Sequence, residues 1–64
     1  MKYKIEIWQW HCVTDTYKSD NLEDALDWYR QNWEACYDNG FCAIDVYIDN
    51  VCLSWDEGYE LGFY

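Results

Sequence analysis

The chain has 64 residues, of which 13 are Asp or Glu and 4 are Lys or Arg, so its formal charge at pH 7 is -9. This length indicates a single compact domain over residues 1–64 and excludes an enzyme with its active site in a cleft between two domains. The charge excludes a general nucleic-acid binder, because phosphate groups are bound by Lys and Arg. The aromatic content of 22% excludes a disordered chain.

The first predicted element is a strand over residues 3–17. Tyr3, Ile5 and Ile7 alternate with polar residues, as in a half-buried strand. The apolar positions then shift by one, to Trp8 and Trp10. A bulge near residues 8–9 explains this shift, and a strand covered on both faces is the alternative.

A helix is predicted over residues 21–38. Asp20 and Glu23 have the spacing of a capping box at its start. Gly40 follows Asp38 and Asn39 and is suited to the left-handed position that ends a helix. Six apolar residues fall on one helical face, within about 80° of one another: Leu22, Ala25, Leu26, Tyr29, Trp33 and Cys36.

Two hairpins are predicted after the helix. A two-residue turn at Asp49 and Asn50 pairs apolar residues on one face: Ile48 with Val51, Val46 with Leu53, and Ile44 with Trp55. A second turn over residues 56–58 continues this pattern: Trp55 pairs with Tyr59, Leu53 with Leu61, and Val51 with Phe63. Any other register would scatter these side chains over both faces. We therefore predict an α+β fold of order β-α-β-β-β, a four-stranded sheet with one helix packed on one face.

The four cysteines are Cys12, Cys36, Cys42 and Cys52, which allow three complete pairings. Residues 1–13 have no continuous apolar segment or small-residue cleavage site, and no apolar run approaches the roughly 18 residues of a membrane span. We therefore expect a cytoplasmic protein with reduced, buried thiols. The absence of a Cys-x-x-Cys motif argues against a metal site.

Negative charge is concentrated in the second half of the chain, where seven acidic residues and no basic one follow Arg30. On the predicted helix, carboxylates form a stripe opposite the apolar face, about 21 Å long at 1.5 Å per residue. The stripe consists of Asp24, Asp27, Glu34 and Asp38. Ordinary solvated helices offset such a stripe with Lys, because like charges three or four residues apart repel.

The predicted sheet presents a second acidic surface on the face away from the helix. There, Asp45, Ser54 and Glu60 lie across three adjacent strands, with Tyr47 in the neighbouring row. Exposed aromatic residues beside unpaired charges are typical of protein-binding surfaces. On this side the candidate partner-binding residues are Asp45, Tyr47, Asp49, Asp56, Glu57 and Glu60. Solubility alone also explains an acidic face, although a net charge of about 2–8 suffices for a small domain.

Carboxylates fixed on a rigid scaffold can occupy the basic groove of a nucleic-acid-binding protein. A DNA duplex presents one negative charge per roughly 1.7 Å of axis, and the helical stripe imitates one strand of it coarsely. Opposed fields give fast, salt-sensitive association, and buried aromatic anchors give lasting affinity. These features predict a non-catalytic inhibitor that acts by nucleic-acid mimicry.

A short, acidic, aromatic-rich chain without proline, with the segments LEDALDWY, DVYIDN and SWDEGYE, resembles the phage-encoded inhibitors of bacterial defence, especially anti-CRISPR proteins. Those inhibitors share no single fold, so the resemblance transfers no residue role. It implies binding to a CRISPR effector in the bacterial host cytoplasm. The bound inhibitor would occupy the site of the guide–target duplex or of the short DNA motif that the effector protein reads. Arg residues that read guanines in that motif are suitable partners for clustered carboxylates.

The alternative is an acidic interaction module, antitoxin- or adaptor-like, that grips a basic partner without competing with nucleic acid. An enzyme is not expected, because Asp56 and Glu57 are neighbours in a predicted turn and point apart. His11 is the single histidine, and the sequence has no nucleophile elbow or phosphate-binding glycine loop. We expect no cofactor and no membrane or direct nucleic-acid partner.

Overall fold

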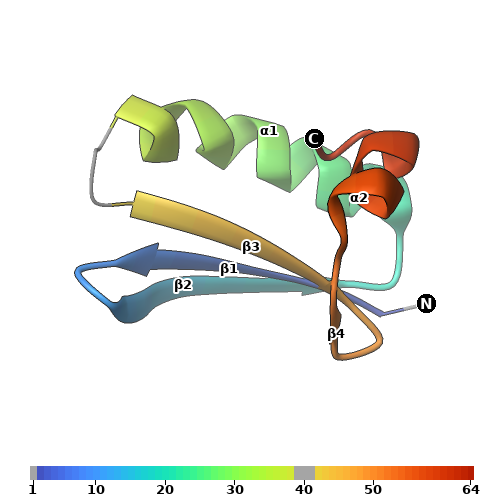
Figure 1. The fold of residues 1–64 in the computed structure, drawn as a ribbon, viewed down its shortest axis with the longest axis horizontal. Coiled ribbons are helices and arrows are strands. Elements are labelled where there is room, and N and C mark those ends of the chain that lie inside the picture. The colour runs from blue at the N-terminus through green and yellow to red at the C-terminus, as the bar shows by residue number, and fades with distance from the viewer. Residues whose placement is uncertain (1, 39–41) are drawn as a thin grey trace.

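The computed structural model describes residues 2–38 and 42–64, with only the backbone described for residues 37 and 38. Its elements are β1 (Tyr3–Gln9), β2 (Cys12–Ser19), α1 (Leu22–Asp38), β3 (Cys42–Ile48), β4 (Val51–Cys52) and α2 (Trp55–Leu61). The strands form one antiparallel sheet of order β2-β1-β3-β4, and both helices lie on the same side of it (Figure 1). The predicted fold class, an α+β fold with a four-stranded sheet and a main helix packed on it, is confirmed. The order of elements differs from the prediction at both ends of the chain.

The first predicted strand is instead a hairpin of two strands. The chain reverses at Trp10 and His11, which have φ values of 54° and 65°. The register between β1 and β2 shifts after Ile7, and Thr14 is the extra residue, with its hydroxyl donating to the Ile7 carbonyl at 3.3 Å. An irregularity therefore lies next to the predicted bulge, with the additional residue in β2. The apolar pattern shifted because the chain turns, at residues that carry no ordinary turn signal.

Helix α1 confirms the predicted helix. Its start is capped by Asn21, whose side-chain oxygen accepts a hydrogen bond from the Asp24 amide at 3.2 Å, so the cap lies one residue after the predicted Asp20. The predicted apolar face points to the sheet, with Ala25 and Tyr29 buried, although Trp33 is 42% exposed. The predicted stop at Gly40 lies outside the described residues.

The β3–β4 hairpin has the predicted turn and register. Asp49 and Asn50 have φ values of 51° and 68°, as a two-residue hairpin turn requires. Ile48 lies opposite Val51, and beyond the two strands the Leu53 amide donates to the Val46 carbonyl at 2.9 Å. Strand β4 then ends, so the predicted pairing of Ile44 with Trp55 does not form.

The last predicted strand and its turn over residues 56–58 are wrong, because residues 55–61 form helix α2. Ser54 caps this helix by accepting a hydrogen bond from the Glu57 amide at 3.3 Å. Gly62, at φ 97°, ends it in the left-handed region. The three predicted cross-strand pairs between residues 51–55 and 59–63 therefore do not exist. The overlooked signal was Ser54-x-x-Glu57, which is a capping box.

The core lies between the sheet and the two helices. Ile5 of β1 and Val46 of β3 are fully buried at its centre. Aromatic side chains complete it, as Tyr29 of α1 meets Phe63 edge to face with ring centroids 5.5 Å apart. Among the described residues, neither helix is long and apolar enough to cross a membrane.

One disulfide joins the end of α1 to the start of β3. It links Cys36 to Cys42, whose Cα atoms are 5.2 Å apart. Cys12 and Cys52 are free and exposed. The expectation of four reduced, buried thiols is therefore wrong. The missed signal is the short spacing of Cys36 and Cys42 across the predicted helix end, which brings the two Cα atoms within disulfide range.

Candidate interaction surfaces

The acidic residues are concentrated in the two helices, which together we call the helical layer (Leu22–Asp38 and Trp55–Leu61). This layer holds eight of the 13 acidic residues and one basic residue, a formal charge of -7. The four strands hold three acidic and two basic residues, a formal charge of -1. The charge of the molecule is therefore segregated by layer.

The predicted stripe on α1 lies on the outer surface of the helix. Asp24, Asp27 and Glu34 are exposed, and the side chain of Asp38 lies outside the described part of the chain. Asp24 accepts a hydrogen bond from the Tyr17 hydroxyl of β2, and this bond lowers the pKa of the Asp24 carboxyl. Asp27 accepts one from the side-chain amide of Gln31 at 2.9 Å. Both partners are neutral, so they hold the carboxylates in place without cancelling their charge.

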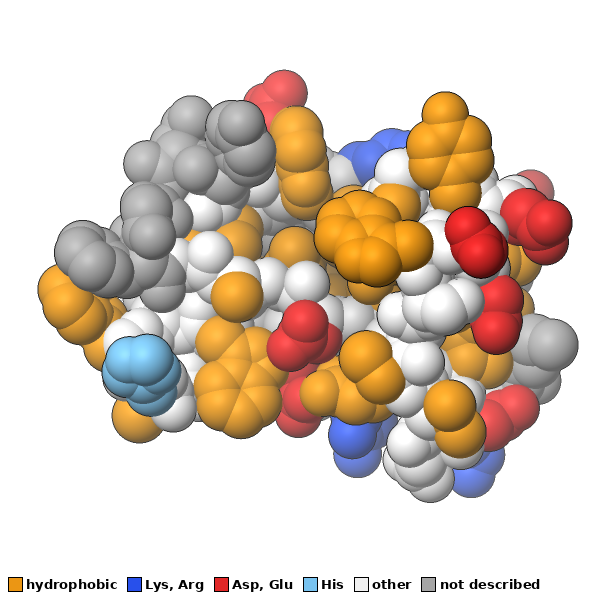
Figure 2. Space-filling model, viewed as in Figure 1, with side chains coloured by type: hydrophobic (Ala, Val, Ile, Leu, Met, Phe, Trp, Pro, Cys, Tyr) orange, Lys and Arg blue, Asp and Glu red, His pale blue; other side chains and the backbone are white. Residues whose placement is uncertain are grey.

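The acidic residues predicted for the second hairpin are brought together on α2. Asp56, Glu57 and Glu60 are all exposed on this short helix. Acidic side chains gather over α2 in the space-filling view, at the right of the molecule (Figure 2). Helix α2 lies on the same side of the sheet as α1 (Figure 1), so its carboxylates add to the negative charge on that side of the molecule.

The predicted acidic platform on the open face of the sheet is wrong. It requires Ser54 and Glu60 on strands, whereas Ser54 caps α2 and Glu60 lies within α2. Asp45 does lie on β3, opposite Glu6 of β1. Tyr47 also lies on β3, and the ammonium group of Lys4 is 4.7 Å from the centroid of the Tyr47 ring. This part of the sheet therefore carries charges of both signs.

Asp49 has a structural contact that the sequence did not indicate. Its carboxylate accepts a hydrogen bond from the backbone amide of Lys2 at 2.8 Å, and its own amide donates to the Lys2 carbonyl at 2.8 Å. Asp49 therefore fixes the N-terminal segment beside the β3–β4 turn.

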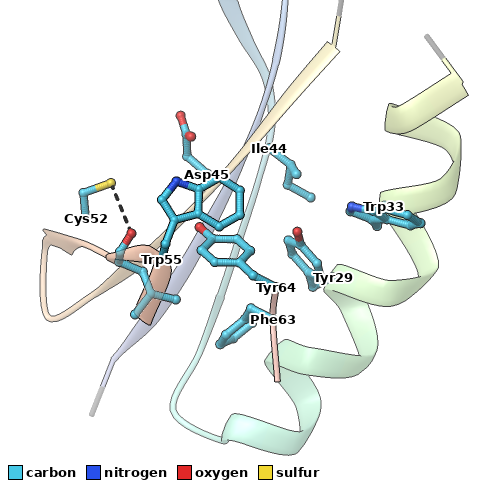
Figure 3. A pocket seen from close by; sticks show the side chains of 9 residues that line it. Tyr29, Trp33, Ile44, Asp45, Cys52, Trp55, Phe63 and Tyr64 are labelled. Carbon is cyan, nitrogen blue, oxygen red and sulfur yellow. Dashed lines mark hydrogen bonds between the residues drawn. The ribbon is translucent and has the colours of Figure 1, made fainter. Parts of the chain in front are cut away.

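A groove with aromatic walls lies between α1, β3 and the segment after α2 (Figure 3). Its volume is about 570 Å³. Trp55 and Tyr64 form one wall, with ring centroids 4.7 Å apart, and Tyr29 lies next to Tyr64 at 6.3 Å. Burial raises the pKa of Tyr29 to about 12. Burial, together with the nearby charges of Cys52 and Asp45, also raises the pKa of Tyr64.

The sequence did not reveal this groove, because the hairpin prediction paired Trp55 with Tyr59. In the structure Tyr59 is 77% exposed on α2 and does not line the groove. Tyr64 reaches the groove because the chain folds back after α2. The Gly58 carbonyl accepts hydrogen bonds from the amides of residues 62, 63 and 64, at 3.1, 2.9 and 3.3 Å.

Comparison with known proteins found no matching family model, no similar curated protein and no similar solved structure. Among the residues that the structure describes, no group of three or more His, Cys, Asp or Glu side chains is arranged to hold a metal ion. The candidate surfaces are thus the acidic helical layer and the aromatic groove.

Proposed function

We propose that this protein is a non-catalytic inhibitor whose helical layer occupies the nucleic-acid-binding groove of a basic target, such as a CRISPR effector nuclease. The observation that carries the proposal is the segregation of charge, with -7 on the helical layer and -1 on the strands. A surface of one sign attracts a basic groove over a distance and aligns the two proteins before contact.

The anchoring of helix α1 and of two of its carboxylates, Asp24 and Asp27, supports mimicry over a general solubility role. Helix α1 is held on the sheet by the buried residues Ala25 and Tyr29. Tyr17 connects it to β2 twice, by its hydrogen bond to Asp24 and by stacking on Trp28 with ring centroids 4.9 Å apart. Side chains one helical turn apart are spaced by about 5 Å. Fixed negative groups at this spacing can replace phosphates without a large loss of side-chain entropy on binding.

The proposed action takes place in the cytoplasm of a bacterial host, as the resemblance to anti-CRISPR proteins implies. Cytosolic thiol systems reduce most disulfides. The proposal therefore requires that binding survives reduction of the Cys36–Cys42 disulfide. The acidic residues of α2 and of the first half of α1 lie outside the short loop that this disulfide closes.

The test is a competition experiment. The tagged protein captures its target from lysates of bacteria that carry CRISPR loci, and the complex is then titrated with duplex DNA and with salt. We expect capture of a guide-loaded effector, its release by excess duplex, and weaker binding as the salt concentration rises. Capture of no nucleic-acid-binding protein would contradict the proposal.

The second candidate is the acidic interaction module, and the groove beside β3 is the observation that favours it. Such a module would keep its partner when duplex DNA or guide RNA is added in excess. The same titration therefore separates the two functions, because only a mimic is displaced.

A further inference from the structure

The outer edge of β3 is only partly covered by β4. The Leu53 amide binds the Val46 carbonyl, so the backbone groups of Val46 point to this edge. Alternate residues of an antiparallel strand direct their backbone groups to the same edge, so those of Ile44 point there too. Strand β4 ends at Cys52, and no described strand pairs with the edge at Ile44. The edge at Ile44 is therefore available to an added strand.

This open edge borders the aromatic groove. Ile44 and Asp45 line the groove from β3, Trp33 lines it from α1, and Trp55 lines it from α2 (Figure 3). The Trp55 side chain is 78% exposed and Trp33 is 42% exposed, although each is among the largest hydrophobic residues of the chain. Exposed indole rings around a cavity are typical of a binding site, because solvent contact of such rings is costly.

The chemistry of the groove selects a positively charged occupant. The faces of Trp and Tyr rings attract ammonium and guanidinium groups, and Asp45, which also lines the groove, supplies a negative charge near enough to raise the pKa of Tyr64. The chain as a whole carries a charge of -9, which repels acidic peptides and nucleic acids. Lys4 over Tyr47 shows the same type of contact within this protein, on the neighbouring strands.

We propose that the groove binds an extended segment of a partner protein, which adds as a strand to the open edge at Ile44 and lays an Arg or Lys side chain over Trp55 and Tyr64, next to Asp45. Backbone hydrogen bonds to the edge supply affinity, and the side-chain site supplies selectivity for a cation. This site uses none of the carboxylates of α1 or α2. It therefore goes beyond nucleic-acid mimicry and does not depend on it.

The experiment uses a defined probe and the whole protein labelled with ¹⁵N. The probe is the blocked peptide Val-Arg-Val-Arg-Val, and the control peptide carries citrulline, which is neutral and nearly isosteric, in place of Arg. We expect the Arg peptide to shift the amide signal of Ile44 and the indole signals of Trp33 and Trp55. The citrulline peptide should bind about tenfold more weakly, as expected for the loss of a desolvated cation–π contact.

Variants assign the site. Trp55→Ala and Asp45→Asn should each weaken binding of the Arg peptide by about five- to tenfold. The matched control is Tyr59→Ala, which removes an equally exposed aromatic residue of α2 outside the groove and should change the affinity by less than twofold. Circular dichroism checks that each variant is folded, and Asp45→Asn tests the site with a minimal change of volume.

Three results would overturn the proposal. They are an unchanged Ile44 amide signal at millimolar peptide, equal binding of the citrulline peptide, and concentration-dependent dimerisation that covers Ile44 and identifies a second copy as the occupant. The peptide assay contains no nucleic acid, so its failure leaves the displacement test of the proposed function unaffected. Conversely, the protein could bind the peptide and yet stay on its target when duplex DNA is added. That result would support the groove site and contradict the mimicry proposal.

Discussion

The helical layer and the sheet of this protein differ in what they contribute. The strands have a formal charge of -1 and supply Ile5 and Val46, the largest fully buried side chains among the described residues, whereas the helices have a charge of -7. Repulsion between like charges on a helix costs a few tenths of a kcal/mol per pair, and burial of apolar side chains against the sheet offsets it. The comparison indicates that stability depends mainly on the interior, while the proposed recognition uses the outer helical surface.

The largest effect on stability is expected from the centre of the sheet. Ile5→Ala removes a side chain that is 0% exposed and should lower the free energy of unfolding by about 3 kcal/mol. The control Glu57→Gln, on the exposed surface of α2, should change it by at most about 0.5 kcal/mol. Urea denaturation measures both. If the two substitutions lowered the free energy of unfolding equally, stability would not depend mainly on the interior.

The next largest effect concerns the bond that joins the two layers. The Cys36–Cys42 disulfide spans six positions of the sequence, and its reduction should lower the free energy of unfolding by about 2 kcal/mol. Affinity for the target should remain within twofold, because the acidic surface of α2 and of the first half of α1 lies away from the disulfide. A Cys12→Ser and Cys52→Ser background ensures that only this pair responds. A large loss of affinity on reduction would contradict action in a reducing cytoplasm.

Charge reversal tests the assignment of recognition to the helical layer. Glu60→Lys on α2 should weaken target binding about tenfold, or about 1.4 kcal/mol, and should reduce the dependence of binding on salt. Asp15→Lys on β2 makes the same change in net charge at another exposed position and should have less than a twofold effect. Similar losses for both variants would show that total charge matters and that its location does not.

The smallest effect concerns one contact between the layers. The hydrogen bond from Tyr17 lowers the pKa of Asp24, so its contribution to stability is present above about pH 4 and is lost as the pH falls through the lowered pKa. Tyr17→Phe should raise the pKa of Asp24 towards its usual value, as measured by carboxyl ¹³C chemical shifts. Tyr59→Phe, on α2, should leave it unchanged. An unaltered pKa in Tyr17→Phe would show that the contact does not order the stripe.

The sequence was sufficient where local signals were strong. The apolar period of α1 predicted its limits closely and placed Asp24, Asp27 and Glu34 on its exposed face, because a 17-residue amphipathic helix has few competing structures. The turn at residues 49–50 was also predicted, since Asp and Asn tolerate positive φ values. The reversal at Trp10 and His11 was not, because bulky residues rarely adopt such values.

The end of the chain was mispredicted because two local signals conflicted there. Gly58 after Asp56 and Glu57 favoured a hairpin turn, whereas Ser54 and Glu57 favoured a helix start. The groove could not be predicted at all, since it depends on the direction of α2. Its aromatic walls come from residues 29, 33, 55, 63 and 64, which only the tertiary structure brings together.

Gly58 restricts how the aromatic groove can change its shape. A Cβ atom at position 58 would lie 2.2 Å from the ring of Tyr64, so the aromatic ring occupies the space that any other residue would fill. The shape of one wall of the groove is thus dictated by a residue that does not line it. A change at this hidden position would push Tyr64 aside and leave every carboxylate of the molecule unaltered, which makes the two surfaces separable by the addition of a single methyl group.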